Sequence, residues 1–553
     1  MVNAFVRQLG AESGVQLNPL RDSSEIPTTD NSDQVFAIMM RATRGRIDKP
    51  FAVDRGNVLS RLGRGEQVRI SALNEAWVHV VEALNKGATQ AIVQRLVPST
   101  ATIDWLVVNL DTSSNQNAQT GIYRYIAMAE LPTTPYLFAV RHLECFNDGI
   151  SVEFHADSVG FGTLASPNDR ITFRLRDREG SLLYEISGSL NREAKDEFGN
   201  SAFLPDIAHA QTDALEVAVG VLGNRAVVSP GDVAYGYDAN GQQKWARSVP
   251  LVCFNERGTA YLTQDYAKAR LALQQSQFDY AYISSGGSQA PALLAQLAQL
   301  AFDTNRQLRF GVPGNLTPEA AITFVNQLNM GASPTAHLLH AFWAPFKSDD
   351  PTGVNPPGYW GTETLNIAYA CGRNAAKNAK GFAPKNYPIA GREWPIQRTR
   401  VNQTYSPSNQ ELHWLARAKI NPVVYETYTG GGRYVFRDSL TCAMVESSLK
   451  KLISVADMSS SIDEAVTRAG KDFLQLPMDI AIRRMRDFLT TLLEGAQASG
   501  WLVPSLDPAM NGRAWTFSVK PNEQRPYDSM DVGFGARYDG TNRQTFVTQT
   551  LTK

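Results

Sequence analysis

Strand-like and helix-like patterns alternate between residues 280 and 343, and this alternation restricts the possible folds more than any other feature of the chain. In the helix-like segments, leucines and alanines recur at steps of three and four residues. In chain order, the predicted units are strand 280–283, helix 291–302, strand 308–312, helix 318–329 and strand 338–343. Thr317 is a suitable N-cap for the second helix. Short units in this order predict a parallel sheet with right-handed crossovers.

A second β–α–β pattern lies near the N-terminus. Residues 35–40 and 91–97 read as strands, and residues 70–85 have helical periodicity, with Gly87 as the C-cap. Residues from about 98 to 250 interrupt the α/β pattern, because their β-like runs are short and their loops are rich in Ser, Asn, Asp and Gly. The sequence therefore predicts a mostly β domain inserted into an α/β domain, whose two parts are expected to share one sheet.

The C-terminal part of the chain is predicted to contain two helices, at residues 461–468 and 478–498. In the second helix, apolar side chains form a stripe and charged side chains lie off it. The two ends of the chain are predicted to be extended. Residues 1–33 are polar and rich in turn-forming residues, whereas residues 543–551 read as a strand with no hairpin partner. An unpaired strand must find a sheet edge or stay solvated.

The composition indicates an ordinary globular protein with more than one domain. A chain of 553 residues is too long for one compact core. Its net charge of -1 does not indicate a surface that binds nucleic acid or an anionic membrane. The N-terminal residues lack the apolar run of a secretory signal, and no apolar stretch is long enough to span a membrane. We therefore expect assembly in a cytoplasm, without membrane insertion.

Residues that could carry catalysis or bind a metal are scattered, and each has a structural explanation. Residues 284–288 match no nucleotide-binding or nucleophile motif and are predicted to form a tight turn. On a strand, His337 and His340 would point to opposite faces, which excludes joint chelation. Asp349 and Asp350 precede Pro and Gly residues and are also predicted to lie in a turn.

The cysteines and one basic cluster are also given structural roles. The four cysteines have no metal-binding spacing and are expected to be buried free thiols: Cys145, Cys253, Cys371 and Cys442. We predict no catalytic site, no metal and no cofactor. The basic cluster has no aromatic residues beside it for base stacking, so we interpret it as a solvated or inter-subunit face. It consists of Arg41, Arg44, Arg46 and Lys49.

Residues 420–440 predict a β-hairpin with a distinctive order of residues. Residues 423–425 form one strand, residues 433–436 form the next, and three glycines at 430–432 allow a tight reversal. An Asn-Pro pair precedes the first strand, and Arg437 follows the second, just before Ser439-Leu440. This order resembles the segment that opens the C-terminal domain of contractile tail sheath proteins of bacteriophages and related injection machines.

The resemblance extends over most of the chain outside the inserted region. Residues 41–50 are similar to the turn after the first strand of the family, with Ala42, Gly45 and Pro50 matching. Residues 80–96 and 343–391 follow further family motifs in the same order. At residues 455–458 the chain reads Val-Ala-Asp-Met where the family has a pair of arginines, so no tube contact is assigned there.

The resemblance implies a fold class and a division of the chain. The expected fold is α/β plus β: a subtilisin-like α/β sheath domain, an inserted mostly β domain, and an α+β C-terminal domain with extended terminal arms. The expected parts are an N-terminal arm at 1–33, the α/β core at 34–97 and 251–420, the inserted outer domain at 98–250, and the C-terminal domain at 421–553, which ends in an arm at 543–553.

The resemblance also implies a structural, non-enzymatic function in a virion. Sheath subunits form a helical assembly of hexameric rings around a tail tube, and contraction drives the tube through the host cell envelope for genome ejection. The expected partners are further copies of the chain, the tail tube protein, and the baseplate and tail terminator proteins. Strand exchange between subunits is expected for Ala4, Phe5, Val6, Thr545, Phe546, Val547 and Thr548. Tube contact is predicted for Arg483, Arg484, Arg486 and Asp487.

Two other functions fit parts of the pattern. An α/β hydrolase-like enzyme with an inserted β domain would have a pocket with convergent polar groups and measurable turnover. Another virion assembly protein, such as a tube, capsid or adhesin protein, would be predominantly β. A clear parallel α/β layer would count against that second alternative.

Overall fold

A large, mostly parallel β-sheet forms the centre of the structure. The computed structural model describes residues 32–111, 122–134, 136–157, 163–164, 170–220, 225–226, 236–256, 258 and 260–549. The sheet has 8 strands in the order β2-β3-β1-β16-β17-β18-β21-β22. These are β1 Val35–Met40, β2 Phe51–Val53, β3 Gln90–Arg95, β16 Tyr282–Ser284, β17 Gln307–Val312, β18 Leu339–Trp343, β21 Ile420–Tyr428 and β22 Gly431–Phe436. The inner strands are parallel, and only the edge strands β2 and β22 are antiparallel to their neighbours in this sheet.

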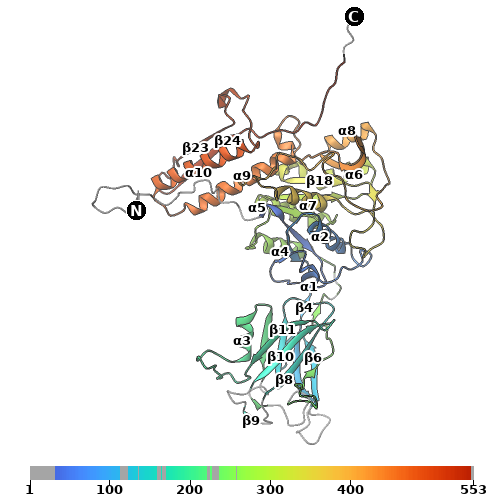
Figure 1. The fold of residues 1–553 in the computed structure, drawn as a ribbon, viewed down its shortest axis with the longest axis vertical. Helices are drawn as coiled ribbons and strands as arrows, with labels where there is room; N and C mark the ends of the chain where they lie inside the picture. The colour runs from blue at the N-terminus through green and yellow to red at the C-terminus, as the bar shows by residue number, and fades with distance from the viewer. Residues whose placement is uncertain are drawn as a thin grey trace, which may run out of the picture.

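Helices cover both faces of the large sheet (Figure 1). One face packs against α2 Glu75–Lys86 and α7 Glu363–Asn374, and the other against α4 Thr263–Gln274, α5 Pro291–Thr304 and α6 Pro318–Leu328. Successive side chains of β1 point to opposite faces, since Phe36 joins one apolar cluster and Ala37 joins the other. A strand buried on both faces needs apolar residues throughout, which explains the continuous apolar run of β1.

Two antiparallel sheets form most of the regular structure described between residues 98 and 250, and this part lies at the lower end of the molecule in Figure 1. Their strand orders are β11-β10-β8-β14 and β12-β7-β5-β6. The strands are β5 Trp105–Asp111, β6 Ile122–Met128, β7 Phe138–His142, β8 Ile150–Ala156, β10 Ile171–Asp177, β11 Leu182–Gly188, β12 Leu215–Val219 and β14 Ala246–Arg247. Both sheets and helix α3 Leu204–Gln211 contribute to one apolar cluster, so this region has its own core.

Small antiparallel pairs complete the β structure of the described residues. β4 Thr102–Ile103 pairs with β15 Phe254–Asn255, so the two connections between the inserted region and the large sheet run side by side. The other pairs are β9 Thr163–Leu164 with β13 Arg225–Ala226, β19 Phe346–Lys347 with β20 Asn402–Gln403, and β23 Trp515–Pro521 with β24 Met530–Ala536.

The C-terminal part consists of two long helices and the hairpin β23–β24. Helix α9 spans Ile453–Asp472 and helix α10 spans Met478–Ala498. Apolar side chains of both helices and of the hairpin form two clusters. The short helices α1 Val58–Leu62 and α8 Asn409–Arg417 lie elsewhere in the chain, and α8 leads directly into β21.

Several sequence predictions are confirmed. Strand β1 and helix α10 have the predicted ends, and Thr317 caps α6 by accepting a hydrogen bond from the backbone N–H of Ala320. Both β–α–β parts lie in one sheet, as expected. Helix α9 begins at Ile453 rather than at residue 461, because its first residues are buried all round and show no amphipathic stripe. Helices α4 and α7 and the hairpin β23–β24 were not predicted. Helix α7 is almost entirely buried, so its sequence also lacks an amphipathic stripe.

The hairpin β21–β22 is also confirmed, with positive φ angles of 130° at Gly430 and 114° at Gly431. Its first strand belongs to the large sheet, since Ile420 pairs with Ala341 of β18. The sheet therefore crosses the domain boundary predicted at residue 420. Residues 541–549 form no strand with any described residue, so the terminal strand expected at residues 543–551 has no partner within the described chain, and its pairing with a neighbouring subunit stays a prediction. No described helix is long and apolar enough to cross a membrane.

Candidate functional site

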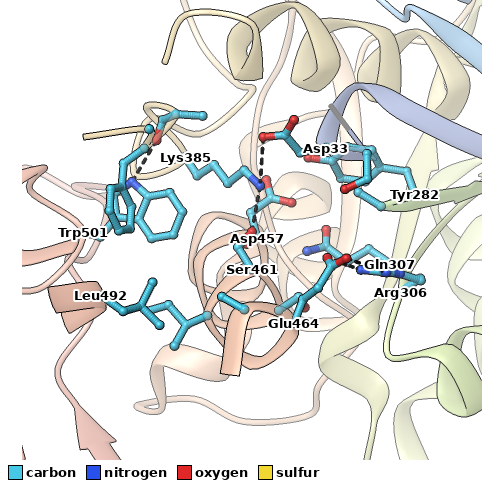
Figure 2. A pocket seen from close by; sticks show the side chains of 18 of the residues that line it. Asp33, Tyr282, Arg306, Gln307, Lys385, Asp457, Ser461, Glu464, Leu492 and Trp501 are labelled. Atoms are coloured by element: carbon cyan, nitrogen blue, oxygen red, sulfur yellow. Dashed lines mark hydrogen bonds and ion pairs between the residues drawn. The ribbon is translucent and has the colours of Figure 1, made fainter. Parts of the chain in front are cut away.

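A small polar cavity lies between the large sheet and helix α9 (Figure 2). Its volume is about 70 Å³. Tyr282 and Gln307, the first residues of β16 and β17, line it from the sheet, and Ser461 and Glu464 line it from α9. This cavity marks the junction where the C-terminal helices meet the α/β part of the chain.

Lys385 is a buried cation at this junction. Its ammonium group donates a hydrogen bond to Ser461 Oγ at 2.7 Å and lies 3.7 Å from Asp33 Oδ2 (Figure 2). Burial lowers the pKa of Lys385, and the carboxylates of Asp33 and Asp457 oppose that shift. The cation thus links the segment before β1 to helix α9.

Asp33 fixes the described chain just before it enters β1. It lies in the 3-10 helix η1 Ser32–Gln34, and its carboxylate is 3.4 Å from Lys377 Nζ. Its carbonyl accepts a hydrogen bond from Asn374 Nδ2 at 2.7 Å. These contacts hold η1 against the end of helix α7.

Asp457 joins helix α9 to the large sheet. Its Oδ2 accepts a hydrogen bond from Arg373 of α7 at 2.8 Å, and its Oδ1 lies 3.7 Å from Arg309 of β17. Burial alone would raise the pKa of Asp457, but the charges of Arg373, Arg309 and Lys385 lower it. Because removal of one partner leaves buried charges uncompensated, this network holds α9 in a fixed position.

The serine turn after β16 is held by a carboxylate from α7. Gly287 N–H donates to Glu363 Oε1 at 2.7 Å, and Ser285 Oγ donates to the same oxygen at 3.3 Å. Gly286 and Gly287 have φ angles of 58° and 75°, which favour glycine. The predicted tight turn is confirmed, and helix α5 follows it with Ala290 as its N-cap.

His79 lies beside this turn without contacting the serines. Its Nε2 is 3.1 Å from Glu75 Oε1 and 4.0 Å from Glu363 Oε1. Burial lowers the pKa of His79, but the two carboxylates outweigh burial and raise it. Ser285 and His79 are thus each bonded to a carboxylate and not to each other.

The remaining candidate residues take structural roles. His337 lies in a 3-10 helix, and the buried ring of His340 on β18 donates from Nε2 to the His337 carbonyl at 3.1 Å. Burial lowers the pKa of His340 to about 3. Asp350 is confirmed in a turn, where it accepts from Thr352 N–H at 2.7 Å, and Asp349 pairs with Arg400 at 2.8 Å. Within the described ranges, no group of three or more His, Cys, Asp or Glu side chains could hold a metal ion.

The four cysteines are buried free thiols, as predicted. Burial raises the pKa of each thiol to about 12.

The interpretation of the basic cluster at residues 41–49 as a solvated or inter-subunit face is wrong. The side chain of Arg44 is 8% exposed and pairs with three carboxylates of the inserted region. The distances from the Arg44 guanidinium to these carboxylates are 2.6 Å for Asp148, 3.3 Å for Asp177 and 2.9 Å for Glu179. Arg46 is 7% exposed and pairs with Asp213 at 3.0 Å.

The other two cations of this cluster differ in their partners. Lys49 pairs with Asp213 of the inserted region, whereas Arg41 lies 3.2 Å from Glu256, which follows that region in the chain. The neighbouring Arg95 donates to the carbonyl of Cys145 at 2.5 Å. The cluster therefore binds the inserted region to the large sheet. Apart from Asp48, which pairs with Arg46 at 2.7 Å, the acidic partners of this cluster lie far along the chain, so the local sequence does not show them.

Helix α10 carries the residues predicted to contact a tail tube. Arg483, Arg484 and Asp487 are exposed, and all lie off the buried stripe that includes Met485 and Leu489. Arg486 is exposed but donates a hydrogen bond to the Val519 carbonyl of β23 at 2.8 Å. The structure thus brings these four residues to one part of the surface, with Arg486 also serving the packing of β23.

Of the two predicted arms, only part of the C-terminal one lies within the described residues. Ala4, Phe5 and Val6 lie outside the described residues. At the other end, residues 545–548 are exposed and lead away from the body (Figure 1). Phe546 is 89% exposed and Val547 is 88% exposed. These two neighbouring apolar side chains are therefore left uncovered by the described part of the chain.

Asp33, Lys385 and Asp457 were not predicted from the sequence. A signal was present at Asp457, because an acidic residue stands between apolar ones in Val-Ala-Asp-Met. A buried carboxylate needs a cation, but the sequence does not show which one.

Comparisons with known proteins bear on the fold. The sequence matches no protein-family model and no curated protein. A sheath tail protein from Listeria innocua, known from a crystal structure, is similar over 92% of this chain and 97% of its own, with a TM-score of 0.52 and 10% identity.

Two further structures are similar at lower scores. A sheath tail protein from Desulfitobacterium hafniense covers 96% of this chain and 100% of its own, with a TM-score of 0.47 and 12% identity. A chain of the contracted anti-feeding prophage baseplate covers 99% and 98%, with a TM-score of 0.46 and 12% identity. The similarity to the Listeria protein shows that this chain has the mixed α/β fold of a sheath tail protein over nearly its whole length.

Proposed function

We propose that this chain is the structural subunit of a contractile tail sheath. Copies of the chain polymerise as stacked hexameric rings around a tail tube, and contraction drives the tube through a host cell envelope. The observation that carries the proposal is the similarity in fold to a sheath tail protein over 92% of the chain. Because one fold can serve several functions, the proposal also depends on surfaces that a single chain leaves open.

The hairpin β23–β24 is a suitable acceptor for the arms of neighbouring subunits. Within the described residues it is a two-stranded sheet, so each strand has an outer edge with unpaired backbone groups. The exposed segment at residues 545–548 has no partner strand among the described residues. Strand addition by this segment and by residues 4–6 of neighbouring subunits would extend the hairpin on both edges.

Helix α10 supplies the surface for the tube. Arg483, Arg484 and Asp487 are exposed on it, and exposed ion pairs are individually worth roughly 0–1 kcal/mol. Contacts of this strength release easily when the sheath contracts, yet they sum over many subunits in the extended state.

The remaining partners follow from the same proposal. The ends of the sheath would contact a baseplate and a tail terminator, and the inserted region at 98–250 would project from the outer surface. The particle would be a phage virion or a related contractile injection system. The role is structural, with no catalysis, no cofactor and no bound nucleic acid.

Electron microscopy of the purified protein tests the proposal. We expect concentrated protein to form hollow tubes or rings with six-fold symmetry in negative stain, either alone or beside a cognate tube. A protein that stays monomeric under both conditions would overturn the proposal. The competing α/β hydrolase predicts turnover of an ester or peptide substrate by the monomer, which the same preparation can be assayed for.

A further inference from the structure

We propose that the ion pair between Arg543 and Asp438 is a clip that sets the direction in which the C-terminal arm leaves the body. Arm exchange between subunits would depend on this clip. The inference rests on the proposed sheath function and adds two positioning residues to it.

The chain after β24 is bonded to the body as far as Asp539. Arg537 N–H donates to the Ala514 carbonyl at 2.9 Å, and Asp539 N–H donates to the Trp501 carbonyl at 2.9 Å. Between them, Tyr538 packs against the apolar cluster of α9 and α10. No backbone hydrogen bond joins residues 540–549 to another described residue. Backbone hydrogen bonds to the body therefore end at residue 539, and before Arg543 the chain makes one further side-chain contact with the described body, between the hydroxyls of Thr541 and Ser454 at 3.4 Å.

The clip holds the chain once more at Arg543. Its Nε donates to Asp438 Oδ1 at 2.8 Å and its Nη2 donates to Asp438 Oδ2 at 2.5 Å. This two-bond geometry fixes the orientation of the guanidinium as well as its distance. The two side chains are 26% and 15% exposed, so water screens the pair only in part.

Asp438 is itself held in place, and among the described residues Arg543 is the cation that forms an ion pair with it. Its Oδ1 accepts a hydrogen bond from the backbone N–H of Ser439 at 3.0 Å. The adjacent Arg437 pairs with Glu426 of β21 instead. Since Asp438 follows β22, the clip connects the arm directly to the edge of the large sheet.

Opening the clip would change both the length and the direction of the arm. With the clip closed, the free segment starts at Gln544, and with the clip open it starts at Asn542, because the Thr541 hydroxyl still lies 3.4 Å from Ser454 Oγ of α9. A longer tether with no preferred direction lowers the effective concentration of the arm at a neighbouring hairpin. It also raises the conformational entropy that is lost when the arm is captured. The clip thus pre-organises the arm for exchange.

Two neutralising variants, Asp438→Asn and Arg543→Gln, test the role in assembly. We expect each to stay folded and to raise the protein concentration needed for sheath polymer, measured by sedimentation, by about three- to tenfold. The charge-reversed double variant Asp438→Arg/Arg543→Asp should recover part of that loss. Glu185→Gln is the matched control, because it breaks the Arg174 pair at 2.6 Å on the inserted region and should leave the critical concentration unchanged.

A spin label at position 545 tests the clip independently of assembly. The variant Thr545→Cys can be labelled selectively, because the four native cysteines are buried. In the monomer, Asp438→Asn should increase the mobility of the label, and Glu185→Gln should not. Unchanged mobility overturns the clip, and increased mobility with unchanged assembly overturns its role in exchange. If the parent protein forms no polymer, the proposed function fails, while the label still decides whether the clip exists.

Discussion

At the scale of single residues, Asp457 is the point where α9 is fixed to the rest of the chain. Its carboxylate faces Arg373 of α7 and Arg309 of β17, and all three side chains are at most 3% exposed. A buried charge network of this kind contributes geometry more than net stability, since desolvation offsets much of the attraction. Removing one member of the network should nevertheless destabilise the protein, because the remaining charges stay buried without a partner.

Replacing Asp457 by Asn should lower the free energy of unfolding by about 3–5 kcal/mol, because the two arginines stay buried without their counter-charge. Chemical denaturation, followed by circular dichroism, measures the change. Asp528→Asn is the control, because its pair with Arg525 is exposed to solvent and its loss should leave the free energy of unfolding almost unchanged. Equal stability of the Asp457 variant and the parent would show that the network does not hold α9.

The same carboxylate should make the junction sensitive to acid. In the folded protein the pKa of Asp457 is lowered from its ordinary value of 3.8, so the unfolded chain takes up this proton more readily than the folded one. The stabilisation is therefore fully present above pH 3.8 and is lost as the pH falls through the lowered folded-state pKa. The stability difference between the parent and Asp457→Asn should narrow in that acid range, as measured by unfolding curves at stepped pH. A difference that stays constant with pH would assign the stabilisation to another group.

At the scale of elements, the arms and helix α10 are the parts that a single chain leaves unused. The apolar face of α10 packs against β23 and α9, whereas the side chains of Arg483 and Arg484 are exposed. The C-terminal arm exposes apolar side chains with no cover from the described residues. Such elements contribute little to the stability of the monomer, so they can change partners without unfolding it.

Deletion of residues 1–20 or of residues 543–553 should leave a folded monomer and abolish polymer. The C-terminal arm makes no backbone hydrogen bond to the described body, so its loss should shift the melting temperature by less than about 2 °C. Circular dichroism and sedimentation velocity measure the two outcomes. An unfolded truncation product would place that segment in the core of its own chain.

Reversing Arg483 and Arg484 to Glu should weaken co-assembly with a tail tube and leave polymers of the sheath alone intact. Both side chains are exposed, so the reversal should not disturb the buried stripe of α10. Pelleting with and without the tube separates the two effects. Arg192→Glu serves as a control on the exposed surface of the inserted region. Unchanged co-assembly would direct attention to the exposed part of α9.

At the scale of the whole molecule, the inserted region has its own apolar core and is joined to the large sheet by ion pairs between side chains. Arg44 and Arg46 reach into it, and β4 and β15 carry the chain in and out side by side. The position of this region is therefore set by buried charges, and its own stability by the apolar cluster between its sheets.

Replacing residues 98–250 by a short Gly/Ser linker should preserve tube formation. The chain enters the region along β4 and leaves it along the neighbouring β15, so the linker replaces a segment whose two connections run side by side, and the released arginines become hydrated instead of buried. Negative-stain microscopy of the deletion variant is the measurement. A folded variant that forms no tubes would mean that the inserted region makes an essential contact between subunits.

The sequence by itself determined the elements whose signals are local. Strand β1, helix α10 and the cap of α6 follow from apolar periodicity and from capping residues, which act over a few neighbouring positions. The joining of the two β–α–β parts in one sheet also followed, because buried parallel strands require partners of the same kind. Helical periodicity also placed the charged residues of α10 off its buried stripe.

Tertiary structure decided everything that depends on partners distant in the chain. The start of α9 and all of α7 are buried all round, which removes the amphipathic pattern that marks a helix. Arg44 and Arg46 read as surface cations until folding brings the carboxylates of Asp177 and Asp213 to them. Asp457, Lys385 and the Arg543–Asp438 clip were likewise beyond the sequence, because the identity of an ion-pair partner is fixed by proximity in space and not along the chain.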